Sequence, residues 1–138
     1  MPAITFDFDE TLTQPIWNEI KQQFEQSSEP NLEAIAKLKQ LYDKGNEMFI
    51  VTSRLNNQEI AEFIKKHKIT IESIFCTAGK LKATQLKELK STMHFDNDEN
   101  EAIANHELGI ATTIVSHHYD KDKSQQSCKF TTYQPKIK

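Results

Sequence analysis

Three aspartates in this sequence follow apolar runs and have the chemistry of cation ligands. Asp7 and Asp9 stand at the end of the apolar run that begins at Ala3, and Asp96 ends the short run Met93–Phe95. Such runs predict buried strands, and an unpaired charge at the end of a buried strand is costly. Carboxylates are ligands that Mg²⁺ prefers, and protein-bound Mg²⁺ usually also holds a phosphate. The three aspartates therefore predict a magnesium site.

A hydroxyl group and a lysine complete a set that could act on a phosphate. Thr52 follows the apolar run Met48–Val51, and Lys80 and Lys82 stand where a helical pattern begins. Hydroxyls, ammonium groups and helix N-terminal amides bind phosphate oxygens. A carboxylate beside a metal can attack phosphorus, and a second carboxylate can protonate the leaving oxygen. Together these groups predict phosphoryl-transfer chemistry.

The hydrophobic pattern predicts a fold that brings these groups together. Short apolar runs predict five strands, near residues 3–8, 48–51, 73–76, 93–95 and 111–115. Periodic apolar residues predict helices after Asn31, an N-cap, and over 57–67, 80–90 and 101–107. Alternating strands and helices predict a three-layer α/β/α sandwich with a mainly parallel, five-stranded Rossmann-like sheet. The carboxyl ends of parallel strands meet at one edge, so we expect the polar groups to converge there.

Length and composition predict one soluble domain, a catalytic unit over residues 1–116 and a tail over 117–138. The 138 residues are 37% hydrophobic and 27% charged, with a formal net charge of −3. This charge gives no global attraction to nucleic acid or lipid, although a local basic patch would suffice for a nucleic-acid end. We expect no membrane partner and no signal peptide. Two cysteines form no disulfide framework, which favours the cytoplasm.

Residues 14–30 are the least regular part of the catalytic unit, and the tail is equally hard to place. Ile16, Trp17, Ile20 and Phe24 fall at helical spacing and predict a short amphipathic helix. We expect these residues to form a small flap, which offers a surface for a homo-oligomer. For the tail, an edge strand and partial disorder both stay open.

Four segments of the chain resemble, in order, the signatures of the haloacid dehalogenase-like (HAD) phosphohydrolase superfamily. The segment Asp7–Thr11 resembles the first signature, Asp-x-Asp-x-Thr. Ile50–Arg54 resembles the second signature, a strand that ends in threonine or serine, and a lysine that opens a later helix resembles the third. Phe95–Asp98 resembles the acidic fourth signature. The resemblance covers residues 2–116, and only the first signature is specific by itself.

The resemblance implies roles for the acidic residues. Asp7 would be the nucleophile and a ligand of Mg²⁺. Asp9 would be the general acid and base and would bind Mg²⁺ through its backbone carbonyl. Asp96 would complete the metal shell. Asn97 stands where relatives often have a second aspartate, so the two acidic residues after it become candidates for the outer shell.

The resemblance also implies roles for the groups that hold phosphate. Thr52 would bind a phosphoryl oxygen through its hydroxyl group. A lysine would neutralise the phospho-aspartate, and Lys82 is favoured over Lys80 because Leu86 follows it by four residues, as in the family pattern.

Arg54 is singled out by composition, because it is the only arginine beside sixteen lysines. It directly follows Thr52 and Ser53. The planar fork of a guanidinium suits phosphate or carboxylate better than an ammonium group does. We expect Ser53 and Arg54 to bind substrate; the alternative is that Arg54 pairs with a neighbouring acid at the surface.

The spacing of the signatures predicts the size of the substrate-binding region. HAD relatives often carry a cap domain between signatures, but the segment from Asp9 to Thr52 has room only for a crossover helix and the flap. The chain thus resembles a capless member with an open active site. Such a site suits a phosphorylated nucleic-acid end, a nucleotide or another phosphomonoester, and the sequence does not choose among them.

The leading hypothesis is a Mg²⁺-dependent phosphomonoester hydrolase that acts through an aspartyl-phosphate. A phospho-accepting signalling module is the first alternative, but a receiver domain places its acceptor after the third strand, where Cys76 and Thr77 are not acidic. A catalytically silent phosphate-binding protein is the second alternative. The intact Asp7 and Asp9 argue against it.

Overall fold

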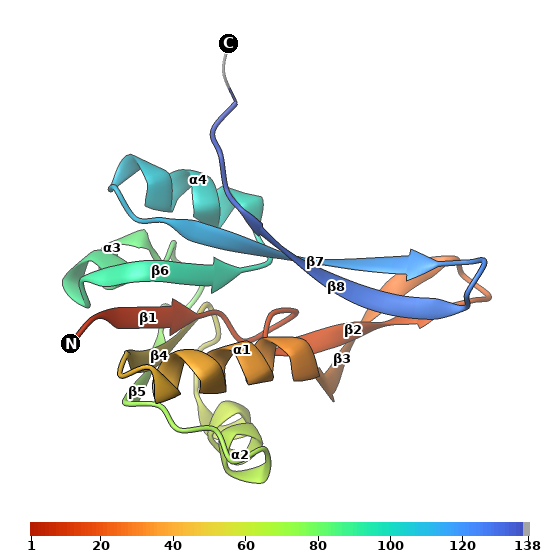
Figure 1. Ribbon diagram of the computed structural model, residues 1–138, viewed down its shortest axis with the longest axis horizontal. Coiled ribbons are helices and arrows are strands. Elements are labelled where there is room, and N and C mark those ends of the chain that lie inside the picture. Colours follow the sequence, from red (N-terminus) through yellow and green to blue (C-terminus); the bar gives the residue numbers. More distant parts are fainter. Residues whose placement is uncertain (137–138) are drawn as a thin grey trace.

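A computed structural model describes residues 1–136, and a six-stranded sheet forms its centre (Figure 1). The strands lie in the spatial order β5-β4-β1-β6-β7-β8. Five of them are parallel, and β8 pairs antiparallel with β7. The bounds are β1 Ala3–Phe6, β4 Glu47–Thr52, β5 Ser73–Cys76, β6 Ser91–Asp96, β7 Thr112–Asp120 and β8 Gln125–Thr132. The predicted mainly parallel sheet is confirmed, with one strand more than the five expected.

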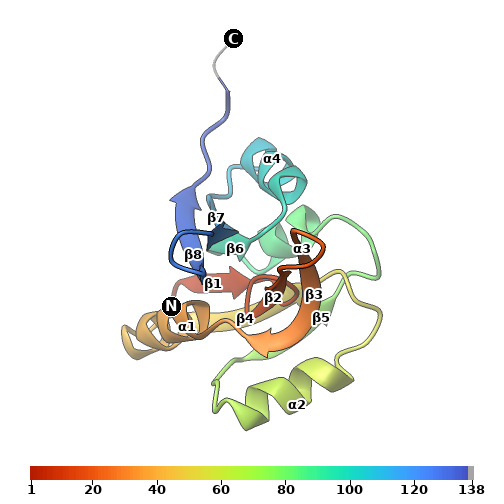
Figure 2. The ribbon, with the colours of Figure 1, turned by 90° about the vertical axis from the view of Figure 1, so that its right-hand side faces the viewer.

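In the described part of the chain, four helices flank the sheet: α1 Leu32–Asp43, α2 Gln58–Lys66, α3 Ala83–Glu88 and α4 Glu99–Glu107. Seen along the strands, α1 and α2 lie on one side of the sheet and α3 and α4 on the other (Figure 2). This arrangement follows from right-handed crossovers on either side of β1. No helix within residues 1–136 combines the length and apolar character that crossing a membrane requires.

The central strand β1 is buried along its whole length because it pairs with β4 on one edge and β6 on the other. Phe6 stacks on its β6 partner Phe95 with ring centroids 4.3 Å apart. A strand covered on both faces holds a fixed register, since a slip of one residue would reverse every side chain. The packing of β1 therefore fixes the position of the loop that follows it, which carries Asp7 and Asp9.

The predicted amphipathic helix in the flap is wrong. Residues 14–30 lie in an antiparallel hairpin of β2 Thr13–Asn18 and β3 Gln23–Pro30. Trp17 and Phe24 are cross-strand partners with ring centroids 5.1 Å apart, and Ile20 is 95% exposed near the turn. A helix would need Ile20 on the same buried face as Trp17. The hairpin instead gathers the aromatic rings and leaves the isoleucine in solvent.

Residues 117–120 complete β7, and β8 follows as the edge strand of the sheet, which is one of the two arrangements that the sequence left open for the tail. Strand β7 continues through His117 and His118, and β8 pairs with it to Thr132, while residues 137–138 lie outside the described part. Tyr119 stacks on Trp17 with ring centroids 4.6 Å apart, which joins the two hairpins. Figure 1 shows both hairpins extending past the carboxyl ends of β1 and β6.

The N-cap of α1 connects this helix to the loop after β1. Asn31 is buried, and its side chain accepts a hydrogen bond from the Ala34 amide at 3.2 Å. Its amide nitrogen donates to the Thr11 carbonyl at 3.0 Å. The predicted cap is thus confirmed, and it also holds the loop that carries the aspartates.

We expect Asn31→Ala to lower the free energy of unfolding by about 2 kcal/mol, because it removes a cap and leaves a buried carbonyl unpaired. Asn57→Ala is the matched control, since Asn57 precedes α2 and makes no capping hydrogen bond through its side chain. Urea unfolding of both variants measures the difference. An equal loss of unfolding free energy in both variants would show that the side-chain hydrogen bonds of Asn31 do not stabilise the protein.

Candidate active site

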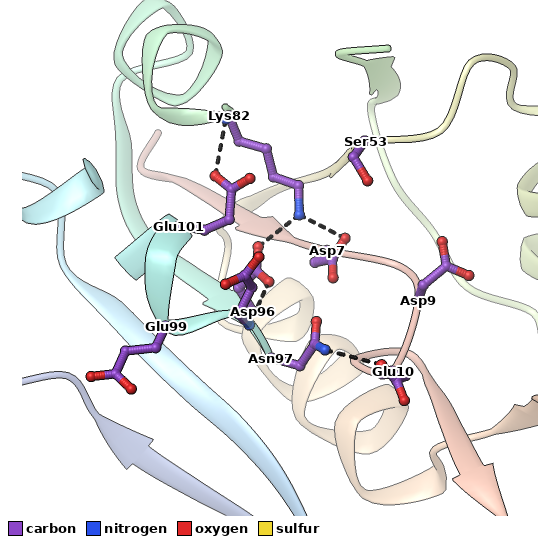
Figure 3. Close-up of a pocket in the computed structure, with 10 residues that line it drawn as sticks. Asp7, Asp9, Glu10, Ser53, Lys82, Asp96, Asn97, Glu99 and Glu101 are labelled. Atoms are coloured by element: carbon purple, nitrogen blue, oxygen red, sulfur yellow. Dashed lines mark hydrogen bonds and ion pairs between the residues drawn. The ribbon is translucent and has the colours of Figure 1, made fainter. Parts of the chain in front are cut away.

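The carboxyl ends of three neighbouring strands, β1, β4 and β6, surround one cavity. Its volume is about 350 Å³. Figure 3 shows the side chains that line it. These are Asp7, Asp9, Glu10, Ser53, Lys82, Asp96, Asn97, Asp98, Glu99 and Glu101. The predicted convergence of the aspartates with a lysine at this edge is therefore confirmed.

Lys82 lies between two carboxylates at the base of the cavity. Its Nζ atom is 2.8 Å from Asp7 Oδ1 and 2.7 Å from Asp96 Oδ2, and all three side chains are buried. The Lys82 backbone N–H donates to the buried Glu101 carboxylate at 3.0 Å, which fixes the start of α3. The fold thus brings β1, β6, α3 and α4 together around one ammonium group.

Burial and charge set the ionisation of these groups. Burial, with the nearby Asp96 carboxylate, raises the pKa of Asp7 from 3.8 to about 7 although Lys82 opposes the shift. Burial acts in the same direction on Asp96, but hydrogen bonds and charge from His94 and Lys82 outweigh it and lower the pKa of Asp96 to about 2. Burial disfavours the Lys82 ammonium, yet the two carboxylates prevail and raise the pKa of Lys82. The two buried carboxylates are tolerated because the Lys82 ammonium group lies between them.

Asp96 is also fixed from inside the sheet. His94 is fully buried, and its Nε2 atom is 2.8 Å from Asp96 Oδ2. Its Nδ1 atom is 2.8 Å from Thr5 Oγ1, which is 2.9 Å from Ser91 Oγ. His94 is therefore a core residue with both ring nitrogens hydrogen-bonded. Its link to Asp96 was missed, and a histidine two residues before an acid on one strand face is the signal for it.

The side-chain amide of Asn97 marks a point where three oxygens converge. With its nitrogen turned toward them, the amide donates to Asp7 Oδ2 at 3.0 Å, the Asp9 carbonyl at 3.2 Å and Asp96 Oδ1 at 3.3 Å. In the opposite orientation, drawn in Figure 3, the nitrogen donates to Glu10 Oε2 at 3.3 Å. The first orientation satisfies both ends of the amide, so we assign it.

These three oxygens are of the kind that bind Mg²⁺. Hard cations bind carboxylate and carbonyl oxygens, and Mg²⁺ uses few protein ligands and keeps several waters. No group of three or more His, Cys, Asp or Glu side chains suited to a metal occurs in residues 1–136. The set here differs from such a group because its third member is the backbone carbonyl of Asp9. Asp7, Asp9 and Asp96 are therefore the residues that would hold the ion.

Arg54 adopts the alternative that the sequence left open, a pair with neighbouring acids. Its Nε and Nη2 atoms each lie 2.8 Å from an oxygen of Asp9, and Nη1 lies 2.9 Å from Glu59. The guanidinium lies over the Phe8 ring at 5.2 Å. Hydrogen bonds from Arg54 to Asp9 and then Glu59 raise the pKa of the guanidinium. The Asp9 carboxylate consequently points away from Asp7 (Figure 3).

The remaining predicted residues divide between the cavity and its wall. Ser53 lines the cavity, whereas Thr52 is fully buried at the end of β4 and its hydroxyl accepts the Arg54 N–H at 3.2 Å. Lys80 is exposed and does not line the cavity. Glu101 was missed by sequence reasoning, because α4 has little amphipathic pattern that would mark this position as buried.

A scan against models of protein families matches none to this chain, and a search of curated proteins finds no relative. The resemblance to the HAD signatures therefore stays a prediction.

We expect Asp7→Asn to raise the melting temperature at pH 8. The pKa of Asp7 is higher in the folded protein than its ordinary value, so folding loses stability as pH rises from 3.8 through about 7. The neutral amide avoids this loss, and a gain of about 1 kcal/mol corresponds to roughly 4 °C. Thermal unfolding at pH 8 and pH 5 should show a smaller gain at pH 5. Asp122→Asn, at an exposed turn, is the control; a lower melting temperature for Asp7→Asn at pH 8 would contradict the prediction.

We expect millimolar Mg²⁺ to raise the melting temperature of the wild type, because an ion that binds only the folded state stabilises it. The stabilisation is about 2.7 kcal/mol at a hundredfold excess over Kd. Asp96→Asn should lose most of the shift, and Asp122→Asn should keep it. An equal shift in both variants would place the ion elsewhere.

Proposed function

We propose that this protein is a Mg²⁺-dependent phosphomonoester hydrolase that acts through an aspartyl-phosphate at Asp7. Its fold is then a capless, HAD-like α/β/α sandwich with a Rossmann-like sheet. The observation that carries the proposal is the pair formed at Asp7. Asp7 Oδ1 contacts Lys82, and Asp7 Oδ2 is one of the three oxygens around the Asn97 amide. A carboxylate placed between an ammonium group and a cation site suits attack on an anionic phosphate.

The reaction divides into two displacements. The Asp7 carboxylate attacks phosphorus, the bond from phosphorus to the ester oxygen breaks, and the leaving oxygen takes a proton from the Asp9 carboxyl group. Asp9 then accepts a proton from water, which attacks phosphorus and breaks the bond to Asp7. Phosphate leaves, and both aspartates return to their initial states.

The surrounding residues prepare this chemistry. Lys82 neutralises negative charge that builds up beside Asp7, and Asp96 holds Lys82 in place through its own ion pair. Mg²⁺, when bound by Asp7, Asp9 and Asp96, would screen the repulsion between the nucleophile and the phosphate. Thr52 ends β4 and Ser53 follows it. Ser53 lines the cavity, so its hydroxyl group is a candidate to bind a phosphoryl oxygen.

The open edge of the site sets few limits on substrate size. The only insertion between the first two signature segments is the hairpin β2–β3, which leaves the cavity accessible beside Ser53 and Glu99. A nucleotide, a phosphorylated nucleic-acid end or a smaller phosphomonoester are all candidate substrates. A homo-oligomer formed through the flap would enclose a small substrate.

We expect the purified protein to hydrolyse p-nitrophenyl phosphate with Mg²⁺ and to lose this activity in EDTA. Asp7→Asn should reduce kcat at least a thousandfold because an amide cannot attack phosphorus as the carboxylate does, whereas Asp122→Asn should remain active. Phosphate release measured at pH 7 provides the comparison.

Two other outcomes would replace the proposal. Labelling of the protein by a small phosphodonor without turnover would favour a signalling module. Phosphate binding without labelling or turnover would favour a silent binding protein. Hydrolysis that survives in Asp7→Asn would also contradict the assigned nucleophile.

A further inference from the structure

Asp9 is held in an arrangement that keeps it from acting as a proton donor. Both of its carboxylate oxygens accept hydrogen bonds from Arg54, at 2.8 Å each, in a two-pronged ion pair. Both oxygens are therefore already engaged by the guanidinium. The carboxylate also points away from Asp7 (Figure 3). Turnover by the proposed mechanism therefore requires that Arg54 release Asp9.

A second cavity lies at this ion pair. It measures about 410 Å³ and is lined by Asp9, Gln26, Arg54, Leu55, Asn56 and Glu59. It shares Asp9 with the first cavity, and Gln26 belongs to the flap strand β3. Because the group that protonates a leaving oxygen must stand beside the leaving group, a cavity at Asp9 is where the leaving group would lie.

The lining of this second cavity defines the ligand that fits it. Arg54 is its one positive group, and the other members are two amides, a leucine and the two acids that Arg54 already binds. A guanidinium has five N–H groups, and three of those on Arg54 have partners within residues 1–136. Its side chain is 30% exposed. An oxyanion entering the cavity would thus meet a fork that already fits oxyanions.

We propose that the second cavity binds the leaving-group part of the substrate, and that this part carries an oxyanion which Arg54 accepts in exchange for Asp9. This inference rests on the proposed function. The exchange replaces one oxyanion by another on the Nε and Nη2 edge, while Nη1 keeps Glu59, so Arg54 is never left unpaired. Asp9 is then able to turn toward the phosphate. Binding of the remote anion is thereby converted into a faster reaction at phosphorus.

A matched pair of substrates tests the exchange. 3-Phosphoglycerate and glycerol 3-phosphate carry the same phosphomonoester at one end of a three-carbon chain. At the other end the first has a carboxylate and the second a hydroxymethyl group. We expect wild-type kcat/KM to favour 3-phosphoglycerate at least tenfold. Arg54→Gln should abolish the preference, lowering kcat/KM for 3-phosphoglycerate while raising kcat for glycerol 3-phosphate, because Asp9 is no longer held.

Lys80→Gln is the control for a general loss of positive charge, since Lys80 is exposed and lines neither cavity. This variant should keep the preference. A second pair, adenosine 3′,5′-bisphosphate against adenosine 3′-monophosphate, separates a phosphate from a carboxylate. The pair with the larger Arg54-dependent preference identifies the oxyanion. If Arg54→Gln lowers kcat/KM by the same factor for both substrates of each pair, the proposal is overturned.

Binding to a variant without turnover separates this proposal from the proposed function. In Asp7→Asn, calorimetry should give a Kd for 3-phosphoglycerate at least tenfold below that for glycerol 3-phosphate, and adding Arg54→Gln should remove the difference. Selective binding without wild-type hydrolysis would contradict the hydrolase and keep the anion site. Hydrolysis with no selectivity for either pair would keep the hydrolase and overturn the anion site.

Discussion

The site depends on one buried ammonium group between two buried carboxylates. Lys82 contacts Asp7 and Asp96 at 2.8 and 2.7 Å. All three side chains are buried, so solvent does not stabilise their charges. Removing Lys82 would leave two uncompensated buried carboxylates, and loss of such a partner costs roughly 3–5 kcal/mol. The arrangement therefore works as a unit that ties β1, β6 and the start of α3 to one geometry. Its net charge is negative, which leaves it complementary to a cation.

Polar groups inside the sheet extend this constraint. Along β6, Ser91 and His94 join Thr5 of β1 in a hydrogen-bonded chain that ends on Asp96. One oxygen of Asp96 accepts from His94 and Lys82, and the other faces the point marked by Asn97. A buried network is stabilising only when its members are satisfied, and here it also fixes which oxygen is available to a ligand.

The sequence was sufficient for the parts of the fold that follow from local patterns. Strand β5 has the predicted bounds, the cap at Asn31 is present, and parallel pairing brings Asp7, Lys82 and Asp96 together. The hairpin β2–β3 was not predictable in this way, because Trp17 is held by Tyr119, a residue far along the chain. The pairing of Arg54 with Asp9 was equally beyond local pattern, since it depends on how β4 lies beside β1.

Asp9 connects the two halves of the site because its backbone and side chain serve different neighbours. Its carbonyl belongs to the group of three oxygens, while its carboxylate belongs to Arg54. The next residue, Glu10, has a left-handed backbone with φ of 57°, and its N–H donates to the Thr13 hydroxyl at 2.9 Å, so the loop backbone is fixed independently of the Asp9 side chain. The Asp9 carboxylate is thus able to change partner without moving the carbonyl. For this reason the proposed cation site and the proposed movement of the Asp9 side chain are compatible in one residue.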